Sequence, residues 1–188
     1  AEAAGSLRRV HETVGDLDLL FTGPGAAAAL DYIVSHPKSQ ETLGLGVNKA
    51  SVTFGLERLQ VDVRALAHDS FGAAMQYCTG SKEHNVVLRT QALKQGLSLN
   101  EYGLFTLHDE QCVAGASEEE VYQRLGYAWI PPELRENSGE LEAAQTGVLP
   151  KLIELADMCG DLHMHTTETD GKATLREMAE AAAALGYQ

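Results

Sequence analysis

The sequence predicts an α+β fold in which a mixed sheet with packed helices is followed by a smaller α/β unit and then by a single strand and helix. Strand-like and helix-like segments alternate between residues 13 and 125. Hydrophobic residues make up 44% of the 188 residues and charged residues 22%, so the chain can bury a core and is too apolar to be disordered. Residues 131–148 are rich in Pro, Glu and Gly, and they predict an exposed connection with some helix.

The sequence pattern of residues 13–66 predicts a mixed sheet covered by a helix. Residues 13–22 contain a partly apolar run that is typical of a strand. A helix is expected over residues 26–36, where Leu30, Ile33 and Val34 share a face and Pro37 ends it. Two β-like segments, 50–54 and 59–66, complete the expected sheet.

The next elements predict two helices. Ser70 is the expected N-cap of a helix through Tyr77 that is broken at Gly80. A longer helix over 82–95 should end at Gly96, a residue that favours the position after a helix.

Two further patterns complete this region. Residues 101–105 and 111–114 flank a turn-like stretch and are expected to pair as a hairpin. Ser117 and Glu120 form a capping-box pattern that predicts a helix to about Leu125.

The C-terminal end predicts a separate strand and helix. The boundary is expected near Cys159, and residues 161–165 read as a short strand. Thr174 and Glu177 form a second capping-box pattern at the start of an Ala-rich helix that runs to Leu185.

Charge and composition narrow the classes of function. A formal net charge of −13 argues against a free-standing nucleic-acid binder, although an enzyme that acts on nucleic acid can still need clustered carboxylates for metal ions. Three cysteines without a C-x-x-C pair predict reduced thiols in a cytoplasmic protein. We find no apolar run of the ~20 residues that a membrane span needs, and no signal peptide, so no membrane association is expected.

The sharpest chemical pattern is a set of three aspartates. Asp16 and Asp18 are two residues apart in a predicted strand, so their carboxylates face the same side and repel unless a cation lies between them. Asp62 lies between apolar residues in another predicted strand and would join them if the two strands are neighbours. Three carboxylates suit two Mg²⁺ or Mn²⁺ ions. Alone, Asp16 and Asp18 read more readily as a chance pair of exposed aspartates on an edge strand than as a metal site.

A Gly-Ser turn precedes these aspartates. The backbone N–H groups at Gly5 and the Ser6 hydroxyl can bind a phosphate, and Arg8 and Arg9 follow within one turn. The pattern is weak in isolation, because paired arginines are usually solvated. The pattern is informative because of its spacing from Asp16 and Asp18.

These residues resemble a known family. The run from Gly5 to Arg9 with Gly15-Asp16-Leu17-Asp18 resembles the nucleotidyltransferase signature of family X DNA polymerases, here in the bacterial form. The stretch 76–85 is similar to the family's Y-F-T-G-S segment, and the stretches 96–105 and 129–135 also resemble the family. The resemblance implies a palm over 1–75, a thumb over 76–135 and a linker over 136–159.

The resemblance also implies roles for individual residues. Asp16, Asp18 and Asp62 would be the catalytic metal ligands. The triphosphate of a dNTP would be held by Gly5, Ser6, Arg9 and Gly15. The sugar and base site would be lined by Tyr77, Gly80 and Asn85, and Arg89 would approach the template strand. Cys78 stands where the family usually has Phe, which puts discrimination between sugars in doubt.

The last segment resembles a second family. The stretch 160–165 with Asp170 is similar to the opening motif of a polymerase and histidinol phosphatase domain, a phosphoesterase barrel, so residues 160–188 would be its first strand and helix. His163 and His165, two residues apart in a strand, could ligate Mn²⁺ or Zn²⁺, with Asp170 as a further ligand. Without this context they read equally well as two exposed histidines.

The resemblance implies a monomeric cytoplasmic DNA polymerase, associated with the nucleoid, that uses dNTPs to extend a primer-template or to fill short gaps during DNA repair. It also implies that the chain begins inside the palm and stops after one phosphoesterase motif. Two alternatives remain open. One is a nucleotidyltransferase that modifies a small molecule or an RNA end, and the other is a DNA-binding module with an inactive palm and a working phosphoesterase.

Overall fold

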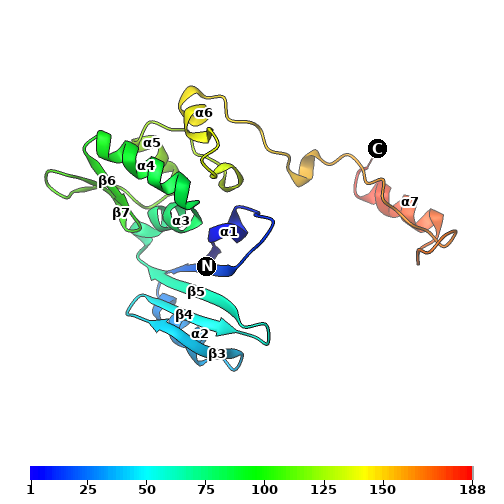
Figure 1. Ribbon diagram of the computed structural model, residues 1–188. Helices are drawn as coiled ribbons and strands as arrows, with labels where there is room; N and C mark the ends of the chain where they lie inside the picture. The colour runs from blue at the N-terminus through cyan, green and yellow to red at the C-terminus, as the bar shows by residue number, and fades with distance from the viewer. Residues whose placement is uncertain (188) are drawn as a thin grey trace. The chain divides into compact units, whose positions relative to one another are not determined.

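The computed structural model describes residues 1–187. The chain folds as two compact units, Ala1–Leu149 and Pro150–Gln188, and each is described by itself (Figure 1). No helix within residues 1–187 combines the length and the apolar character needed to cross a lipid bilayer.

The first unit contains the predicted mixed sheet. Strands β2 and β5 run parallel, and the other neighbouring pairs are antiparallel. The strands lie in the order β1 (Glu2–Ala3), β2 (Asp16–Thr22), β5 (Leu59–Leu66), β4 (Lys49–Phe54) and β3 (Ser39–Leu45). The mixed α+β class is therefore confirmed. Strand β3 was not predicted, because it is an exposed edge strand without a clear alternation of apolar residues.

One face of this sheet packs against helix α2 (Ala26–Ser35). Side chains alternate along a strand, so Leu17 and Leu19 of β2 lie on this face with Val61 and Val63 of β5, and they pack with Leu30 of the helix. The predicted helix and its apolar face are confirmed.

The opposite face packs against helices α1 (Gly5–Arg8) and α3 (Phe71–Thr79). Leu20 is fully buried there with Ala4 and Ala74. The prediction that the Ser70 side chain caps α3 is wrong. Ser70 ends a short 3₁₀ helix (His68–Ser70), its backbone has ψ −3°, and its hydroxyl makes no capping hydrogen bond. A capping side chain ordinarily starts from an extended backbone.

The second half of this unit has its own core. Helix α4 (Lys82–Lys94) lies beside the strands β6 (Leu97–Asn100), β7 (Gly103–Thr106) and β8 (Cys112–Ala114). The predicted hairpin is confirmed by the antiparallel pairing of β7 with β8. The cap of α5 (Glu118–Arg124) is confirmed as well, since Ser117 Oγ accepts a hydrogen bond from the Glu120 N–H at 3.1 Å.

The helix expected within residues 131–148 is confirmed, but the expectation that this stretch is only an exposed connection is wrong. A short 3₁₀ helix (Pro132–Leu134) and α6 (Glu140–Thr146) occupy this stretch. Leu141 and Ala144, three residues apart on α6, are buried in the core of this half, and Arg135 is completely buried. Residues 136–149 therefore belong to the first compact unit.

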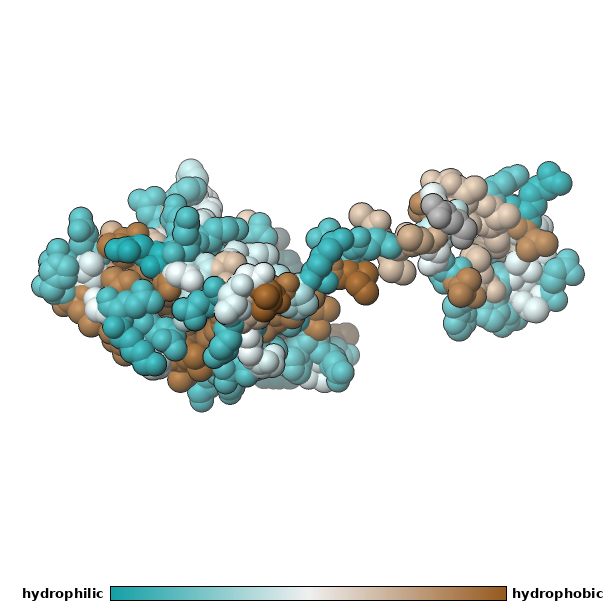
Figure 2. All heavy atoms as spheres, turned by 90° about the horizontal axis from the view of Figure 1, so that it is seen from above, coloured by the Kyte–Doolittle hydropathy of each residue, from teal (hydrophilic) through white to brown (hydrophobic). Residues whose placement is uncertain are grey.

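The second unit contains a 3₁₀ helix (Leu155–Asp157) and α7 (Leu175–Ala184). Its predicted capping box is confirmed, because Thr174 and Glu177 bond each other's backbone N–H groups. The predicted strand over 161–165 does not form, since none of residues 1–187 pairs with this segment and an unpaired segment lacks ladder hydrogen bonds. Figure 2 shows apolar side chains on the surface of this unit, where Leu162 and Leu185 are exposed.

Candidate active site

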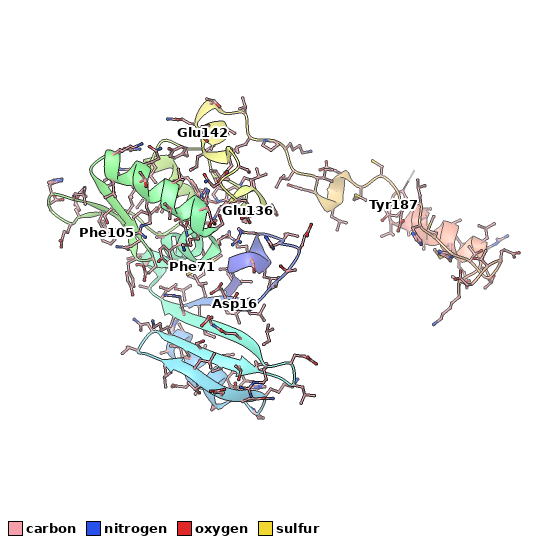
Figure 3. The ribbon with its side chains drawn as sticks, viewed as in Figure 1. Asp16, Phe71, Phe105, Glu136, Glu142 and Tyr187 are labelled. Carbon is pink, nitrogen blue, oxygen red and sulfur yellow. The ribbon has the colours of Figure 1, made fainter. Side chains whose placement is uncertain are left out.

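The three aspartates lie on adjacent parallel strands. Asp18 of β2 is directly opposite Asp62 of β5, and Asp16 lies two residues before Asp18. All three are on the face of the sheet away from α2, because their neighbours Leu17, Leu19, Val61 and Val63 occupy the other face. Figure 3 shows Asp16 at the start of β2, near α1. The parallel pairing thus places on one face residues that are 44 positions apart in the chain.

Asp18 is the most constrained of the three. A Cβ atom at Gly5 would come within 2.3 Å of Asp18 Oδ2, so the carboxylate packs directly against the first residue of α1. Burial, together with repulsion by Asp16 and Asp62, raises the pKa of the Asp18 carboxyl to about 6. Mutual repulsion of this kind is relieved by a cation, so the hard oxygen donors of this face suit a divalent ion.

The carboxylates are neighbours without converging on one point. Asp62 Oδ2 accepts a hydrogen bond from Gln60 Nε2 at 2.7 Å, which holds Asp62 along its own strand. Within residues 1–187, no three His, Cys, Asp or Glu side chains lie close enough together to hold a metal ion. The three carboxylates therefore lie on the same face of the sheet, and their side chains must rotate before all three can bind one ion.

A cleft of about 530 Å³ connects this face to α1 and α4. Its walls carry both the acidic pair and three cationic side chains, so it can hold an anion beside a carboxylate-bound cation. The lining residues are Gly5, Ser6, Arg9, Asp16, Asp18, Tyr77, Cys78, Gly80, Lys82, Asn85, Val86 and Arg89.

Nine of the predicted site residues line this cleft. Gly15 does not line it, although it directly precedes Asp16, and Asp62 lines a second cleft that shares Asp18 with the first. Sequence reasoning missed Lys82 and Val86 as lining residues. One turn of α4 separates Lys82 from Asn85, so the predicted helix register was a signal that could have identified Lys82.

The second cleft carries cations that the sequence analysis also missed. Lys49 and Arg64 line it together with Asp18 and Asp62. Arg64 follows Asp62 by two residues on β5, so its position on the carboxylate face is a direct consequence of strand alternation.

The two adjacent arginines of α1 have different partners. Arg8 makes two hydrogen bonds to the Glu118 carboxylate, both 2.8 Å long, and a third to Thr79 Oγ1 at 2.7 Å. Arg9 lines the cleft, and two groups outside the lining hold it: its Nη1 donates to the Thr79 carbonyl and its Nε donates to Glu136 Oε1 at 2.6 Å. Arg8 thus holds α1 in place, and Arg9 supplies positive charge to the cleft.

Hydrogen bonds connect residues of α3 with Asn85 of α4. Asn85 Nδ2 donates to the Tyr77 carbonyl at 2.7 Å, and Asn85 Oδ1 accepts from Gln76 Nε2 at 2.8 Å. Burial raises the pKa of the neighbouring Cys78 thiol to about 11, so this side chain is a neutral thiol at physiological pH.

A buried charge network lies behind the cleft. Arg135 is completely buried, and its guanidinium donates to Glu118, which also binds Arg8 and the Trp129 indole N–H. Glu118 is also buried, which alone would raise its pKa, but the hydrogen bonds from Arg8 and Arg135 lower the pKa of its carboxyl to about 2. The network was not predicted, because its members are up to 110 residues apart.

The histidine pair of the second unit lies in an exposed segment that is neither helix nor strand. The ring centroids of His163 and His165 are 5.2 Å apart, and His165 Nδ1 lies 2.7 Å from Asp170 Oδ1. The three predicted ligands are therefore neighbours without a shared strand, and among residues 1–187 they do not form a three-ligand metal group.

Comparison with known proteins agrees with this geometry. Residues 74–136 match the family model described as the DNA polymerase beta thumb. The chain is 38% identical over 186 residues to the DNA polymerase/3'-5' exonuclease PolX of Bacillus subtilis, an alignment that covers 98% of this chain and 32% of the relative. DNA polymerase lambda of Rattus norvegicus is 28% identical over 162 residues, covering 71% of this chain and 28% of the relative.

Solved structures resemble the chain as well. A ternary gap complex of Leishmania infantum polymerase beta matches with a TM-score of 0.62 and 26% identity, covering 72% of this chain and 61% of that one. A ternary P/T complex of the same polymerase matches with a TM-score of 0.61 and 27% identity, covering 72% and 66%.

The fold is that of a nucleotidyltransferase palm followed by a thumb. The sequence resembles the family X DNA polymerases, and its similarity to the bacterial member extends over nearly its whole length. It spans about a third of the length of that relative.

Proposed function

We propose that the protein is a DNA-directed DNA polymerase that transfers nucleotides by a two-metal mechanism. The observation that carries this proposal is the cleft that Asp16 and Asp18 line together with Arg9, Gly5 and Ser6. Such a cleft can bind a triphosphate at one end and neutralise its reacting phosphate at the other.

The triphosphate would be bound by the residues of α1 and the segment before β2. Arg9 offers charge-assisted hydrogen bonds to phosphate oxygens, and Ser6 adds a hydroxyl from the cleft wall. Gly5 and Gly15 would let the backbone approach the phosphates closely. Lys82, from the other wall, would add a second cation.

Asp16, Asp18 and Asp62 would hold Mg²⁺ or Mn²⁺. When bound, these ions would neutralise the charge that develops on the attacking and leaving oxygens of the transferred phosphate. The protein would contribute by holding three carboxylates on one face of the sheet. The close packing of Asp18 against Gly5 would restrict the position of that carboxylate.

The wall formed by α3 and α4 would recognise the remaining substrate groups. Tyr77, Gly80 and Asn85 would contact the sugar and base of the dNTP, and the exposed Arg89 would contact the template strand. Support comes from the hydrogen bond of Asn85 to the Tyr77 carbonyl, which fixes the orientation of a side chain that lines the cleft.

We further infer that the substrate is gapped DNA and that the protein fills short gaps during DNA repair. The similarity to a polymerase beta determined as a ternary gap complex supports this inference. The protein would act as a nucleoid-associated monomer in the cytoplasm. Residues 160–188 would begin a phosphoesterase domain, in which His163, His165 and Asp170 would ligate Mn²⁺ or Zn²⁺.

The test is primer extension by the full-length protein on gapped DNA and on an open primer-template, with Mg²⁺ or Mn²⁺. We expect template-directed addition of dNTPs, with faster addition in the gap. Extension that ignores the template would favour another nucleotidyltransferase, and an absence of extension would leave the palm as a binding module.

A further inference from the structure

Arg9 is fixed from two directions by groups that follow it in the chain by 70 and 127 residues. Its Nη1 donates to the Thr79 carbonyl, and its Nε donates to Glu136 Oε1 at 2.6 Å. The side chain of Arg9 is only 13% exposed, whereas that of Glu136 is 39% exposed. An arginine held at two separate N–H groups has its guanidinium plane defined rather than free to rotate.

The carboxylate approaches Arg9 from outside the cleft. Arg9 is one of the residues that line the cleft, and Glu136 is not. Within residues 1–187, Arg9 Nη2 has no hydrogen-bond partner, so both of its N–H groups can bind a ligand in the cleft. An anion in the cleft can therefore reach Arg9 without displacing Glu136.

Glu136 is itself held in place by the buried residue before it. The guanidinium of Arg135 donates to Glu118 at 2.7 Å and to the Ile130 carbonyl at 2.9 Å. The Arg135 carbonyl accepts from the Ser81 N–H at 2.9 Å, next to Gly80 in the cleft wall. The short segment of Arg135 and Glu136 thus supports Arg9 and the Gly80 turn from behind.

We propose that Glu136 is a positioning residue for nucleotide binding: it orients Arg9 so that the free N–H groups of the guanidinium face the triphosphate. This inference rests on the proposed function, because it assumes that the anion in the cleft is a nucleotide triphosphate. Glu136 acts through Arg9 and has no contact with the substrate of its own.

A competing role for Glu136 would predict a lower KM for dNTP after its removal. If Glu136 competed with the triphosphate for Arg9, its removal would tighten nucleotide binding. The position of Glu136 outside the cleft argues for positioning, since a competitor must occupy the space of the ligand.

The experiment measures kcat and KM for dNTP on gapped DNA with the full-length protein. Glu136→Ala should raise KM by roughly tenfold, the value of one oriented charge-assisted contact, and leave kcat within about twofold. Glu136→Asp retains the charge, but its side chain is too short to contact Arg9 Nε, so its KM should resemble that of Glu136→Ala. Glu136→Gln retains the acceptor oxygen and should stay near the parent.

Two controls separate positioning from a general effect. Glu133→Ala removes the same charge from an exposed residue of the same segment that makes no hydrogen bond to Arg9, and KM should not change. In an Arg9→Ala background, Glu136→Ala should have no further effect on KM, because its route of action is gone. Affinity for gapped DNA and the melting temperature should stay at parental values in every Glu136 variant.

The outcomes are decisive in both directions. An unchanged or lower KM in Glu136→Ala, or an effect that persists without Arg9, overturns the positioning role while the polymerase assignment stands. Glu136→Asp at the parental KM would overturn it as well, because charge without orientation would then suffice. A parent protein that shows no saturable dependence on dNTP overturns the proposed function, and the inference fails with it.

Discussion

Gly5 and Asp18 depend on each other at the scale of single residues. Gly5 has a φ of +63°, and a Cβ atom there would lie 2.3 Å from Asp18 Oδ2. Both the left-handed backbone and the close approach therefore require glycine. The glycine that the sequence analysis assigned to phosphate binding also determines where a predicted metal ligand lies.

Gly5→Ala should reduce stability and abolish primer extension. Backbone strain at positive φ costs about 1–2 kcal/mol, and the new methyl group must displace Asp18. Gly147→Ala is the matched control, because Gly147 has a φ of +73° and open space where its Cβ would lie. Urea denaturation should show similar losses for both variants from strain, with a further loss and inactivity in Gly5→Ala alone. Full activity in Gly5→Ala would contradict the close approach.

Asp62→Ala should abolish extension and leave the fold intact. Asp62 is half-buried on the surface of the sheet, so its removal takes a carboxylate from the cation site without opening a cavity in the core. Asp31→Ala, on the exposed side of α2, removes the same charge and should extend primers normally. Activity assays paired with thermal melts test this prediction, and normal extension by folded Asp62→Ala would refute the three-aspartate assignment.

At the scale of elements, Glu118 joins α1, α5 and the segment before α6. It accepts hydrogen bonds from Arg8 of α1, from the buried Arg135 and from Trp129. Because α1 carries the arginine that faces the cleft, the packing of the thumb-side helices and the geometry of the cleft are coupled through one buried carboxylate.

Glu118→Ala should destabilise the protein by about 3–5 kcal/mol, since it leaves buried cations without their partner. Glu119→Ala, its exposed neighbour, should change the free energy of unfolding by less than ~0.5 kcal/mol. Urea denaturation at neutral pH measures both. A loss below ~1 kcal/mol in Glu118→Ala would show that the network adds little to stability.

The same carboxylate predicts a pH dependence. Its pKa is lowered in the folded protein from 4.5 to about 2, so the unfolded chain binds the proton more readily. Glu118 therefore contributes its full stabilisation above pH 4.5, and this contribution is lost as the pH falls toward 2. The stability difference between the parent and Glu118→Ala should narrow as the pH is lowered below 4.5. A constant difference would contradict the lowered pKa.

At the scale of the whole molecule, the two compact units predict separable activities. The cleft lies in Ala1–Leu149 and the histidine pair lies in Pro150–Gln188. In the full-length protein, the double variant His163→Ala, His165→Ala should lose phosphoesterase activity and extend primers at the parental rate. The exposed His68 and His108 of the first unit provide a matched double control. Loss of extension with hydrolysis intact would place the pair in polymerase chemistry.

Local sequence patterns determined most individual elements and the order of the candidate site residues. Strand alternation placed Asp16 and Asp18 on one face, and the caps at Ser117 and Thr174 marked two helix starts correctly. These features depend on residues within four positions of each other, so the chain encodes them locally. The Ser70 cap failed because a preceding 3₁₀ turn changed the backbone on which it depended.

Only the tertiary structure decided which distant residues meet. The pairing of β2 with β5 brings Asp62 beside Asp18, and the fold carries Glu118 to Arg8 and Glu136 to Arg9. Burial of Leu141 and Ala144 joins the expected exposed connection over residues 131–148 to a core. The predicted strand at 161–165 shows the same limit, since a strand exists only with a partner. Such contacts join residues more than 40 positions apart, and their energies depend on burial and geometry that no local pattern carries.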